Sequence, residues 1–171
     1  MQLLPGKAAV QRLKNLVSEK HQVHAYHVDF TARTIYGLNP TGEVDFGGSE
    51  YVPAQRQDVR THQKHSQDRY QWWELPHGAY LVEFNEALDL KDDEIALLEP
   101  HERLLRAGAS HNANFIRGQT SPVHTLLNVT SARIQIKQNA RISTVRVFKL
   151  APAAKGAAPA KPAKKSKAKR R

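Results

Sequence analysis

The chain lacks cysteine altogether, and this absence narrows the kinds of site it can hold. Without thiolates there is no disulfide framework, no cysteine nucleophile and no thiolate-ligated zinc, so a metal site would have to use histidine and carboxylate side chains. The chain also has no run of about eighteen apolar residues, which a membrane-spanning helix requires. Residues 1–5 are too short for the apolar core of a signal peptide. We therefore expect a cytoplasmic protein with no membrane contact.

Acidic residues are absent from residues 151–171, where most of the net positive charge is concentrated. The formal net charge of the whole chain is +10, and the tail supplies eight of these charges, which leaves residues 1–150 almost neutral at +2. The body therefore has no obligate surface for a polyanion. The tail alternates alanine, proline and lysine, so it cannot form a core and we expect it to be disordered. It either binds a polyanion such as nucleic acid, with strong salt dependence, or only keeps the protein soluble.

A length of 171 residues and a hydrophobic content of 40% are enough for one domain with a real core. Within residues 1–22, the segment 7–22 spaces its apolar side chains three and four positions apart, with lysine and arginine between them. This spacing predicts an amphipathic helix of about four turns. We expect its apolar stripe to pack on the domain or on a neighbouring subunit. The apolar residues of this segment are Ala9, Val10, Leu13, Leu16 and Val17.

Residues 23–150 are predicted to form an all-β domain. Short apolar runs recur through this range, and glycine, asparagine, proline and serine separate them. Residues 101–108 are typical of one or two helical turns with a stop at Gly108. Residues 72–75 begin the main sheet region. The other predicted strands cover residues 23–36, 79–84, 95–100, 123–129, 133–137 and 142–150.

Residues 51–71 interrupt the domain with a long polar stretch. Such a stretch cannot bury much apolar surface, so it is predicted to be a loop or an arm. Loops of this length inside a compact domain are often functional, as a lid or as an arm between subunits. Trp72 and Trp73 follow directly. Because neighbouring residues of a strand face opposite sides, one of them faces inward, which favours core or interface packing over stacking on a base.

Three histidines, His21, His24 and His27, are spaced by three. On a helix they would align and indicate a metal site. On the strand that the surrounding residues predict, His24 and His27 would point to opposite faces. We therefore interpret them as solvated or singly hydrogen-bonded histidines and predict no metal site.

The order of features from Val28 to Leu150 resembles the trimeric dUTPase and dCTP deaminase superfamily. Residues 94–109 look like that family's strand and short helix, written Gly-Arg-Ser-Ser-Leu-x-Arg-x-Gly. Residues 141–148 look like its closing strand, Arg-Ile-Ala-Gln-Leu-x-Phe. Two further segments, 25–30 and 75–82, look like its early Val-Asp strand and its Leu-x-Pro-Gly strand entry. The resemblance implies a distorted jelly roll of the dUTPase-like β-clip type, a homotrimer, and a nucleotide pocket between subunits.

The departures from the family fall where its chemistry should be. The phosphate-gripping Arg-Ser-Ser aligns with His101, Glu102 and Arg103, of which Glu102 would repel a triphosphate. Arg117 stands where the family's acidic base would be, and arginine cannot take a proton from water near pH 7. Of the family's loop that carries this acid, only the glycine is present, as Gly118. These losses favour a fold kept for binding while the family's own hydrolysis is lost.

The resemblance also implies two sets of site residues. Replacement chemistry would use His101 or His111 as the base, with Glu102 or Glu99 as its partner. A cluster of arginines is a reasonable phosphate site. The ligand-binding candidates are Arg103, Arg106, Arg117, Gly118, Gln119 and Thr144, the last in the place of the family's nucleotide-reading glutamine.

Two functions follow from these features. The first is a divergent dUTPase-like or dCTP deaminase-like protein that binds a deoxynucleoside triphosphate or a similar anion, with Mg²⁺ if a triphosphate is bound, and that hydrolyses or deaminates it if replacement chemistry operates. The second is a non-catalytic scaffold or a nucleic-acid-associated β domain that acts through residues 151–171. The residues do not choose between them.

Overall fold

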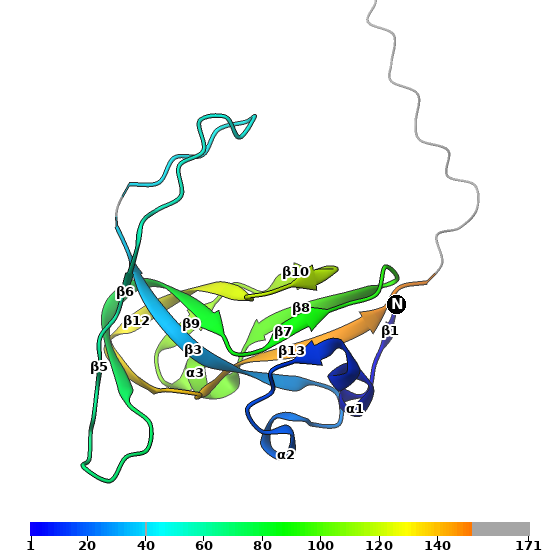
Figure 1. Ribbon diagram of the computed structural model, residues 1–171, viewed down its shortest axis with the longest axis horizontal. Coiled ribbons are helices and arrows are strands. Elements are labelled where there is room, and N and C mark those ends of the chain that lie inside the picture. The colour runs from blue at the N-terminus through cyan, green and yellow to red at the C-terminus, as the bar shows by residue number, and fades with distance from the viewer. Residues whose placement is uncertain (40, 152–171) are drawn as a thin grey trace, which may run out of the picture.

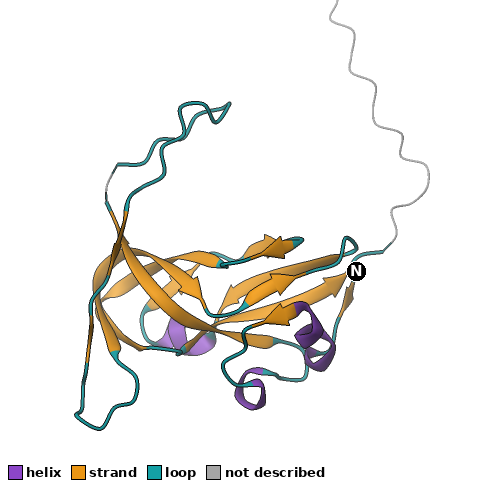
Figure 2. Ribbon diagram, in the orientation of Figure 1, coloured by secondary structure: helices purple, strands orange, loops and turns teal. Residues whose placement is uncertain are grey.

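The protein is built on one curled antiparallel sheet of ten strands with a smaller sheet beside it (Figures 1 and 2). The computed structural model describes residues 1–39 and 41–151. The main path of the large sheet runs β10, β8, β13, β3, β6, β12, β9, while β1, β4 and β5 pair with β13, β3 and β6. The smaller sheet has the order β11, β7, β2. The predicted all-β class is confirmed.

The strands of the large sheet are β1 (Gln2–Leu3), β3 (Val28–Leu38), β4 (Arg56–Asp58), β5 (Thr61–His62), β6 (Trp72–Phe84), β8 (Glu94–Pro100), β9 (Ala109–His111), β10 (Asn114–Ile116), β12 (His124–Lys137) and β13 (Arg141–Lys149). Those of the small sheet are β2 (Leu13–Lys14), β7 (Ala87–Asp89) and β11 (Gln119–Thr120). The helices are α1 (Gly6–Ala9), the 3₁₀ turn η1 (Val10–Arg12), α2 (Glu19–Gln22) and α3 (Glu102–Arg106).

The core lies on the inner face of the curled sheet. It is filled by the apolar side chains that point inward at alternate positions of the strands. Phe30 of β3 and Phe84 of β6 are buried and meet edge to face, with ring centroids 5.7 Å apart. Such a pair adds about 0.5–1.5 kcal/mol beyond the apolar area it buries. Trp73 is also buried in this core, which confirms that one member of the tryptophan pair faces inward.

The opposite face of β13 carries the polar side chains that matter for the site. Val145 and Val147 are buried, whereas Thr144 and Arg146, which alternate with them, are partly exposed. Because side chains alternate along a strand, Thr144 and Arg146 share the outer face. In the pairing register Thr144 lies opposite Asp29 of β3 on one side and opposite Glu99 of β8 on the other.

The prediction of one amphipathic helix over residues 7–22 is wrong. The segment is divided into α1, η1, the strand β2 and α2, and Asn15 after β2 has a positive φ of 64° that a helix cannot accommodate. Leu13 instead pairs with Leu88 of β7. Ala9, Val10, Leu13 and Leu16 still pack on the core, as predicted, but without a continuous helix, whereas Val17 is exposed.

The polar stretch 51–71 contributes the short strands β4 and β5 to the rim of the large sheet. In Figure 1 the adjoining residues 41–55 (cyan) project away from the sheet, and residues 63–71 form a second loop below it. The predicted disorder of residues 151–171 falls outside the described residues, apart from Ala151.

No helix in the described part of the chain is long and apolar enough to cross a membrane.

Candidate functional site

The helix α3 is the centre of the candidate site, and both of its ends are tied to strands. At its start, the backbone N–H of His101 donates to the carbonyl of Ile142 on β13 (2.9 Å). At its end, the carbonyl of Gly108 accepts the backbone N–H groups of Thr130 (2.9 Å) and Ser131 (3.0 Å), at an irregularity of β12. Gly108 has φ +85°, and a Cβ there would lie 2.6 Å from Cβ of Ser131. Only glycine fits this position.

One side of α3 borders a pocket of about 360 Å³, which we name the α3 pocket. Its floor is apolar, formed by Leu104, Ile134, Ile136 and Ile142, and its rim holds Trp72, Gln135 and Asn139 together with the cations Arg103, Lys137 and Arg141. Lys137 is paired with Asp68 (3.0 Å) and Arg141 with Asp29 (3.2 Å). Within residues 1–39 and 41–151, Arg103 forms no ion pair, so its charge is free for an anion.

The other side of α3 borders a pocket of about 340 Å³, which we name the strand pocket. It lies over the outer face of β8 and β13, and Arg146 on its wall is bonded to Glu99. The residues that line it are His27, Glu99, Pro100, His101, Glu102, Leu105, Thr144 and Arg146.

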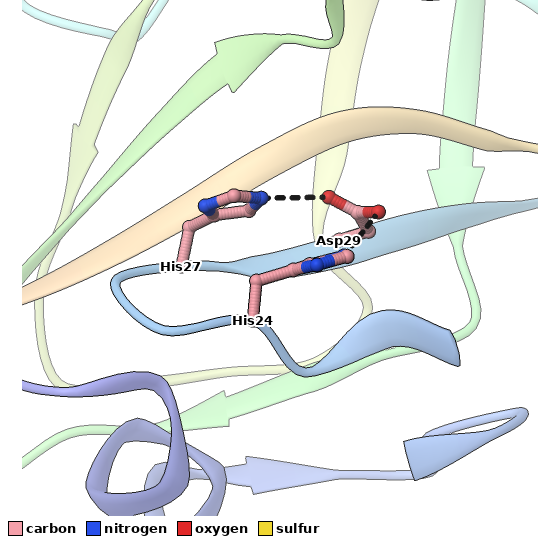
Figure 3. Close-up of side chains that lie close together, drawn as sticks. All are labelled: His24, His27 and Asp29. Carbon is pink, nitrogen blue, oxygen red and sulfur yellow. Dashed lines mark hydrogen bonds and ion pairs between the residues drawn. The ribbon is translucent and has the colours of Figure 1, made fainter. Parts of the chain in front are cut away.

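Asp29 lies between the two pockets and is surrounded by cationic or cation-forming side chains. Its own side chain is only 1% exposed. The Nε2 atom of His24 is 3.0 Å from Oδ2, and Nη1 of Arg141 is 3.2 Å from the same oxygen. His27 approaches Oδ1 at 3.5 Å, and His101 approaches Oδ2 at 3.8 Å. Figure 3 shows the His24 and His27 rings stacked beside this carboxylate.

Burial lowers the pKa of His27 and the pKa of His101, although the nearby Asp29 charge acts in the opposite direction in both cases. At these distances the desolvation of the charged imidazolium lowers the pKa more than the nearby carboxylate raises it. Both rings are therefore expected to be neutral at neutral pH, and able to accept a proton or a metal only through a nitrogen that is not already bonded.

Of the three predicted catalytic residues, His101 and Glu102 line the strand pocket together, whereas His111 lies in the buried interior. The Nδ1 atom of His101 accepts the backbone N–H of Arg103 (3.0 Å) as the N-cap of α3, while Nε2 faces Asp29. Glu102 is an exposed side chain paired with Arg106 at 2.5 Å. His111 is buried, with Nε2 bonded to the Ser143 hydroxyl. In this arrangement His101 is hydrogen-bonded through Nδ1 alone, because its Nε2 atom is 3.8 Å from Asp29, and His111 lies inside the core.

The predicted ligand-binding residues fall into two groups. Arg103 lines the α3 pocket, Thr144 lines the strand pocket, and Arg106 lies on α3 between them. Arg117 and Gly118 line a third pocket with Asp92 and Glu94, at the start of β8, and Gln119 pairs with Asp89 in the small sheet. The α3 group follows the end of β8. Seven residues of strand at about 3.3 Å each separate the groups by roughly 20 Å.

The grouping of His24, His27 and Asp29 is the part of the site that the sequence interpretation missed. The prediction assumed a continuous strand, in which the two histidines point apart. Instead, Val23 and Val28 form an isolated antiparallel bridge, and the backbone N–H of His24 donates to the carbonyl of His27 (3.0 Å). The four residues 24–27 are thus a tight turn, and the His-x-x-His-x-Asp spacing was the signal that could have found it.

Comparisons with known proteins agree with the resemblance. No protein-family model matches the chain. A probable deoxyuridine 5'-triphosphate nucleotidohydrolase of Methanosarcina acetivorans is 30% identical over 147 residues, which cover 84% of this chain and 82% of that relative. The chain belongs to the dUTPase and dCTP deaminase superfamily. Another member named in the same way, from Methanosarcina mazei, is 28% identical over 146 residues and covers 84% of this chain.

The fold of this superfamily is confirmed by a solved structure. The 2'-deoxycytidine 5'-triphosphate deaminase of Agrobacterium tumefaciens superposes with a TM-score of 0.62 at 18% identity, over 85% of this chain and 48% of that chain. The present chain therefore spans about half the length of that deaminase. The distorted jelly roll expected from the sequence is the fold observed.

Proposed function

We propose that this chain binds a pyrimidine deoxynucleoside triphosphate at α3. The observation that carries the proposal is the α3 pocket, which combines an apolar floor with three cations, one of them unpaired within the described residues. The family supports it, since curated relatives of this chain are named as probable deoxyuridine 5'-triphosphate nucleotidohydrolases.

The α3 pocket suits both ends of such a ligand. Its volume of about 360 Å³ falls within the range of small-molecule sites. The isoleucine and leucine floor accommodates a sugar and a pyrimidine ring, and the amides of Gln135 and Asn139 offer donors and acceptors for a base edge. Arg103 supplies a guanidinium for a phosphate, because its fork of N–H donors matches phosphate oxygens.

We further propose a homotrimer, because one chain cannot unite the two groups of predicted ligand residues. Arg117, Gly118 and Gln119 lie near the start of β8, and Arg103 lies beyond its end. A ligand that uses both groups must therefore lie between two chains, with α3 from one and residues 117–119 from its neighbour. This arrangement agrees with the site between subunits that the resemblance implies.

Magnesium would accompany the triphosphate in this proposal. The carboxylates beside α3 are already engaged in the described structure, Glu99 with Arg146 and Glu102 with Arg106. We therefore assign the ion to the phosphate oxygens and assign it no ligand from the chain.

The experiment is a titration of the full-length chain with dUTP and with dCTP in the presence of magnesium, followed by calorimetry. Arg103→Ala should weaken binding about tenfold or more, since a charged hydrogen bond contributes roughly 1.5–3 kcal/mol. The matched control is Arg33→Ala, which removes an exposed arginine of β3 that does not line the α3 pocket. Equal affinities for wild type and Arg103→Ala would refute the site.

A complementation experiment tests the position of the site between chains. Arg103→Ala and Arg117→Ala chains should each bind poorly, whereas a mixed assembly contains some sites with both arginines and should recover part of the binding. Sedimentation velocity should give the mass of three chains. No recovery in the mixture, or a monomer in solution, would refute the shared site.

The same samples decide whether binding leads to reaction. Pyrophosphate release from dUTP would indicate a hydrolase, and ammonia release from dCTP a deaminase. Binding without either product would leave a non-catalytic binding protein, the outcome that Arg117 in place of the family's acid favours. If neither nucleotide binds, the scaffold or nucleic-acid role through residues 151–171 becomes the better hypothesis.

A further inference from the structure

The turn 24–27 forms a second cluster of interest, separate from the α3 pocket. One nitrogen from His24, one from His27 and one carboxylate oxygen of Asp29 all lie within 4.8 Å of one another (Figure 3). From these residues we infer that the chain holds a first-row divalent transition metal ion, bound by His24, His27 and Asp29. The inference does not rest on nucleotide binding.

The distances suit a metal ion. A tetrahedral zinc ion with bonds of about 2.0–2.1 Å sets its ligand atoms roughly 3.3 Å apart. The Nε2 atom of His24 is 3.0 Å from Oδ2 of Asp29, and the Nε2 atom of His27 is 3.5 Å from Oδ1, so each histidine lies near that separation from a different oxygen of the carboxylate. An ion held on Oδ1 therefore requires the His24 ring to turn from Oδ2 towards Oδ1.

Asp29 provides an independent reason to expect a ligand. Its Oδ1 atom is buried and accepts no hydrogen bond within the described residues. A buried carboxylate oxygen without a partner is costly, because it has lost its water and gained nothing in return. The Nε2 atom of His27 is directed at this oxygen but does not meet hydrogen-bond geometry. A cation between them would satisfy both groups.

The remaining contacts of Asp29 match the surroundings of a metal-binding carboxylate. Ligating carboxylates are usually hydrogen-bonded through their second oxygen, which fixes their orientation. Here Arg141 donates to Oδ2 (3.2 Å) and also to the carbonyl of His21 (2.7 Å). One guanidinium therefore holds the carboxylate and the segment before the turn in place.

The turn that carries the histidines is also held against the N-terminal segment. The backbone N–H of Gly6 donates to the carbonyl of Ala25 (2.9 Å), and a Cβ on Gly6 would lie 1.9 Å from the carbonyl oxygen of His24. Gly6 thus allows a close approach that fixes the turn from the outside. Both ligand histidines are borne on backbone that is restrained from two sides.

The ligand types define the class of metal. Two imidazoles with one carboxylate favour zinc and neighbouring transition metals, whereas magnesium and calcium prefer all-oxygen sites. Three ligands from the chain leave one position of a tetrahedral ion for water or an anion. His24 and His27 are partly exposed, with side-chain exposures of 39% and 29%, so an ion can enter from solvent.

The test uses untagged full-length protein, stripped with a chelator and then titrated. Zn²⁺ should bind at one equivalent per chain by calorimetry, and Co²⁺ should develop visible absorption bands of a low-coordinate site. A large excess of Mg²⁺ should not compete. The inference would be overturned if the wild-type chain does not bind Zn²⁺, or if excess Mg²⁺ displaces the bound Zn²⁺.

Single histidine variants locate the ion. His24→Ala and His27→Ala should each weaken Zn²⁺ binding by at least about tenfold, the loss expected even for outer-shell partners. The matched control is His77→Ala, which removes an exposed histidine of β6 and should bind as wild type. Circular dichroism checks that all three fold. Wild-type affinity in both His24→Ala and His27→Ala would refute the site, and so would an equal loss in His77→Ala.

Discussion

The Nε2 atom of His111 lies 2.7 Å from the hydroxyl oxygen of Ser143, and both side chains are buried. The Nδ1 atom of His111 is 3.0 Å from the carbonyl oxygen of Asn112, which can only accept, so Nδ1 carries the proton and Nε2 accepts from Ser143. The bond joins β9, the last strand of the main path, to β13, the third strand of that path. It therefore fastens the curled sheet across its interior.

This histidine should make stability depend on pH. Burial lowers the pKa of His111 below its usual 6.5. The unfolded chain thus binds a proton more readily than the folded one, so the contribution of His111 is complete above pH 6.5 and is lost as pH falls from there towards the folded pKa. We expect the free energy of unfolding to decrease, with a slope of at most about 1.4 kcal/mol per pH unit from this residue.

Urea unfolding at pH 7.5 and at pH 5.5 measures this effect. Other histidines with a lowered pKa act in the same direction, so the informative quantity is the difference between wild type and His111→Gln. The variant should be less stable at pH 7.5 and should lose less on acidification. Identical pH slopes would assign the acid sensitivity to other groups.

Glu86 should be a second point of sensitivity. It is fully buried and accepts hydrogen bonds from the Gln22 amide (2.7 Å), the Thr31 N–H (2.8 Å) and the Thr31 hydroxyl (2.6 Å), while its burial raises its pKa. Glu86→Ala leaves these donors without an acceptor, at about 1–3 kcal/mol each for those that stay buried. We expect a loss of about 2–4 kcal/mol in unfolding free energy.

Chemical denaturation of Glu86→Ala measures this loss, and Glu102→Ala is its control. Glu102 is exposed and its pair with Arg106 follows the i, i+4 pattern, so its removal should cost no more than about 0.5 kcal/mol. Similar losses of unfolding free energy in the two variants would show that the hydrogen bonds of Glu86 do not stabilise the fold more than an exposed ion pair does.

Gly6→Ala should destabilise the N-terminal segment. The new Cβ would meet the His24 carbonyl at 1.9 Å and the His27 carbonyl at 3.0 Å, and both are backbone atoms that cannot rotate away. We expect a loss of about 1–3 kcal/mol, as for other overpacked positions. Gly47→Ala is the control, because the nearest atom to its Cβ is a side-chain oxygen 3.8 Å away. Equal thermal midpoints for the two variants would contradict the clash.

Removal of residues 151–171 tests the proposed role of the tail. The tail carries eight positive charges and no acid. If it binds polyanions by counterion release, the full chain should bind labelled single-stranded DNA weakly, and more weakly as salt rises. The truncated chain should not bind, and its binding of deoxynucleotides should be unchanged. DNA binding that survives truncation, read by fluorescence anisotropy, would place the polyanion site in residues 1–150.

The elements that could be predicted from sequence are those set by local periodicity. Residues 95–100 and 142–150 alternate or run apolar, and they form β8 and β13 within one residue of the expected ends. The helical turns predicted over 101–108 correspond to α3 and its stop at Gly108. In these segments the side-chain pattern and the backbone preference point the same way.

The remainder depends on contacts between distant residues. The apolar spacing of residues 7–22 is compatible with a helix, but pairing of Leu13 with Leu88 determines its actual conformation. His24 and His27 point to opposite faces on a strand and to one side in a turn, and the bridge between Val23 and Val28 selects the turn. Arg103 and Arg117, predicted together as phosphate donors, lie at opposite ends of β8 within one chain, a separation that the residue pattern alone does not give.

The five residues of α3 are too few to be stable as an isolated helix. The orientation of α3 is therefore set by its backbone hydrogen bonds to two strands. His101 bonds to β13, and Gly108 bonds to β12. Substitutions around Thr130 and Ser131, which touch neither pocket, would tilt the helix and change the spacing between Arg103 and Thr144. If the proposed ligand binds at α3, its affinity should therefore respond to substitutions at Thr130 and Ser131, two residues of β12 that line neither pocket.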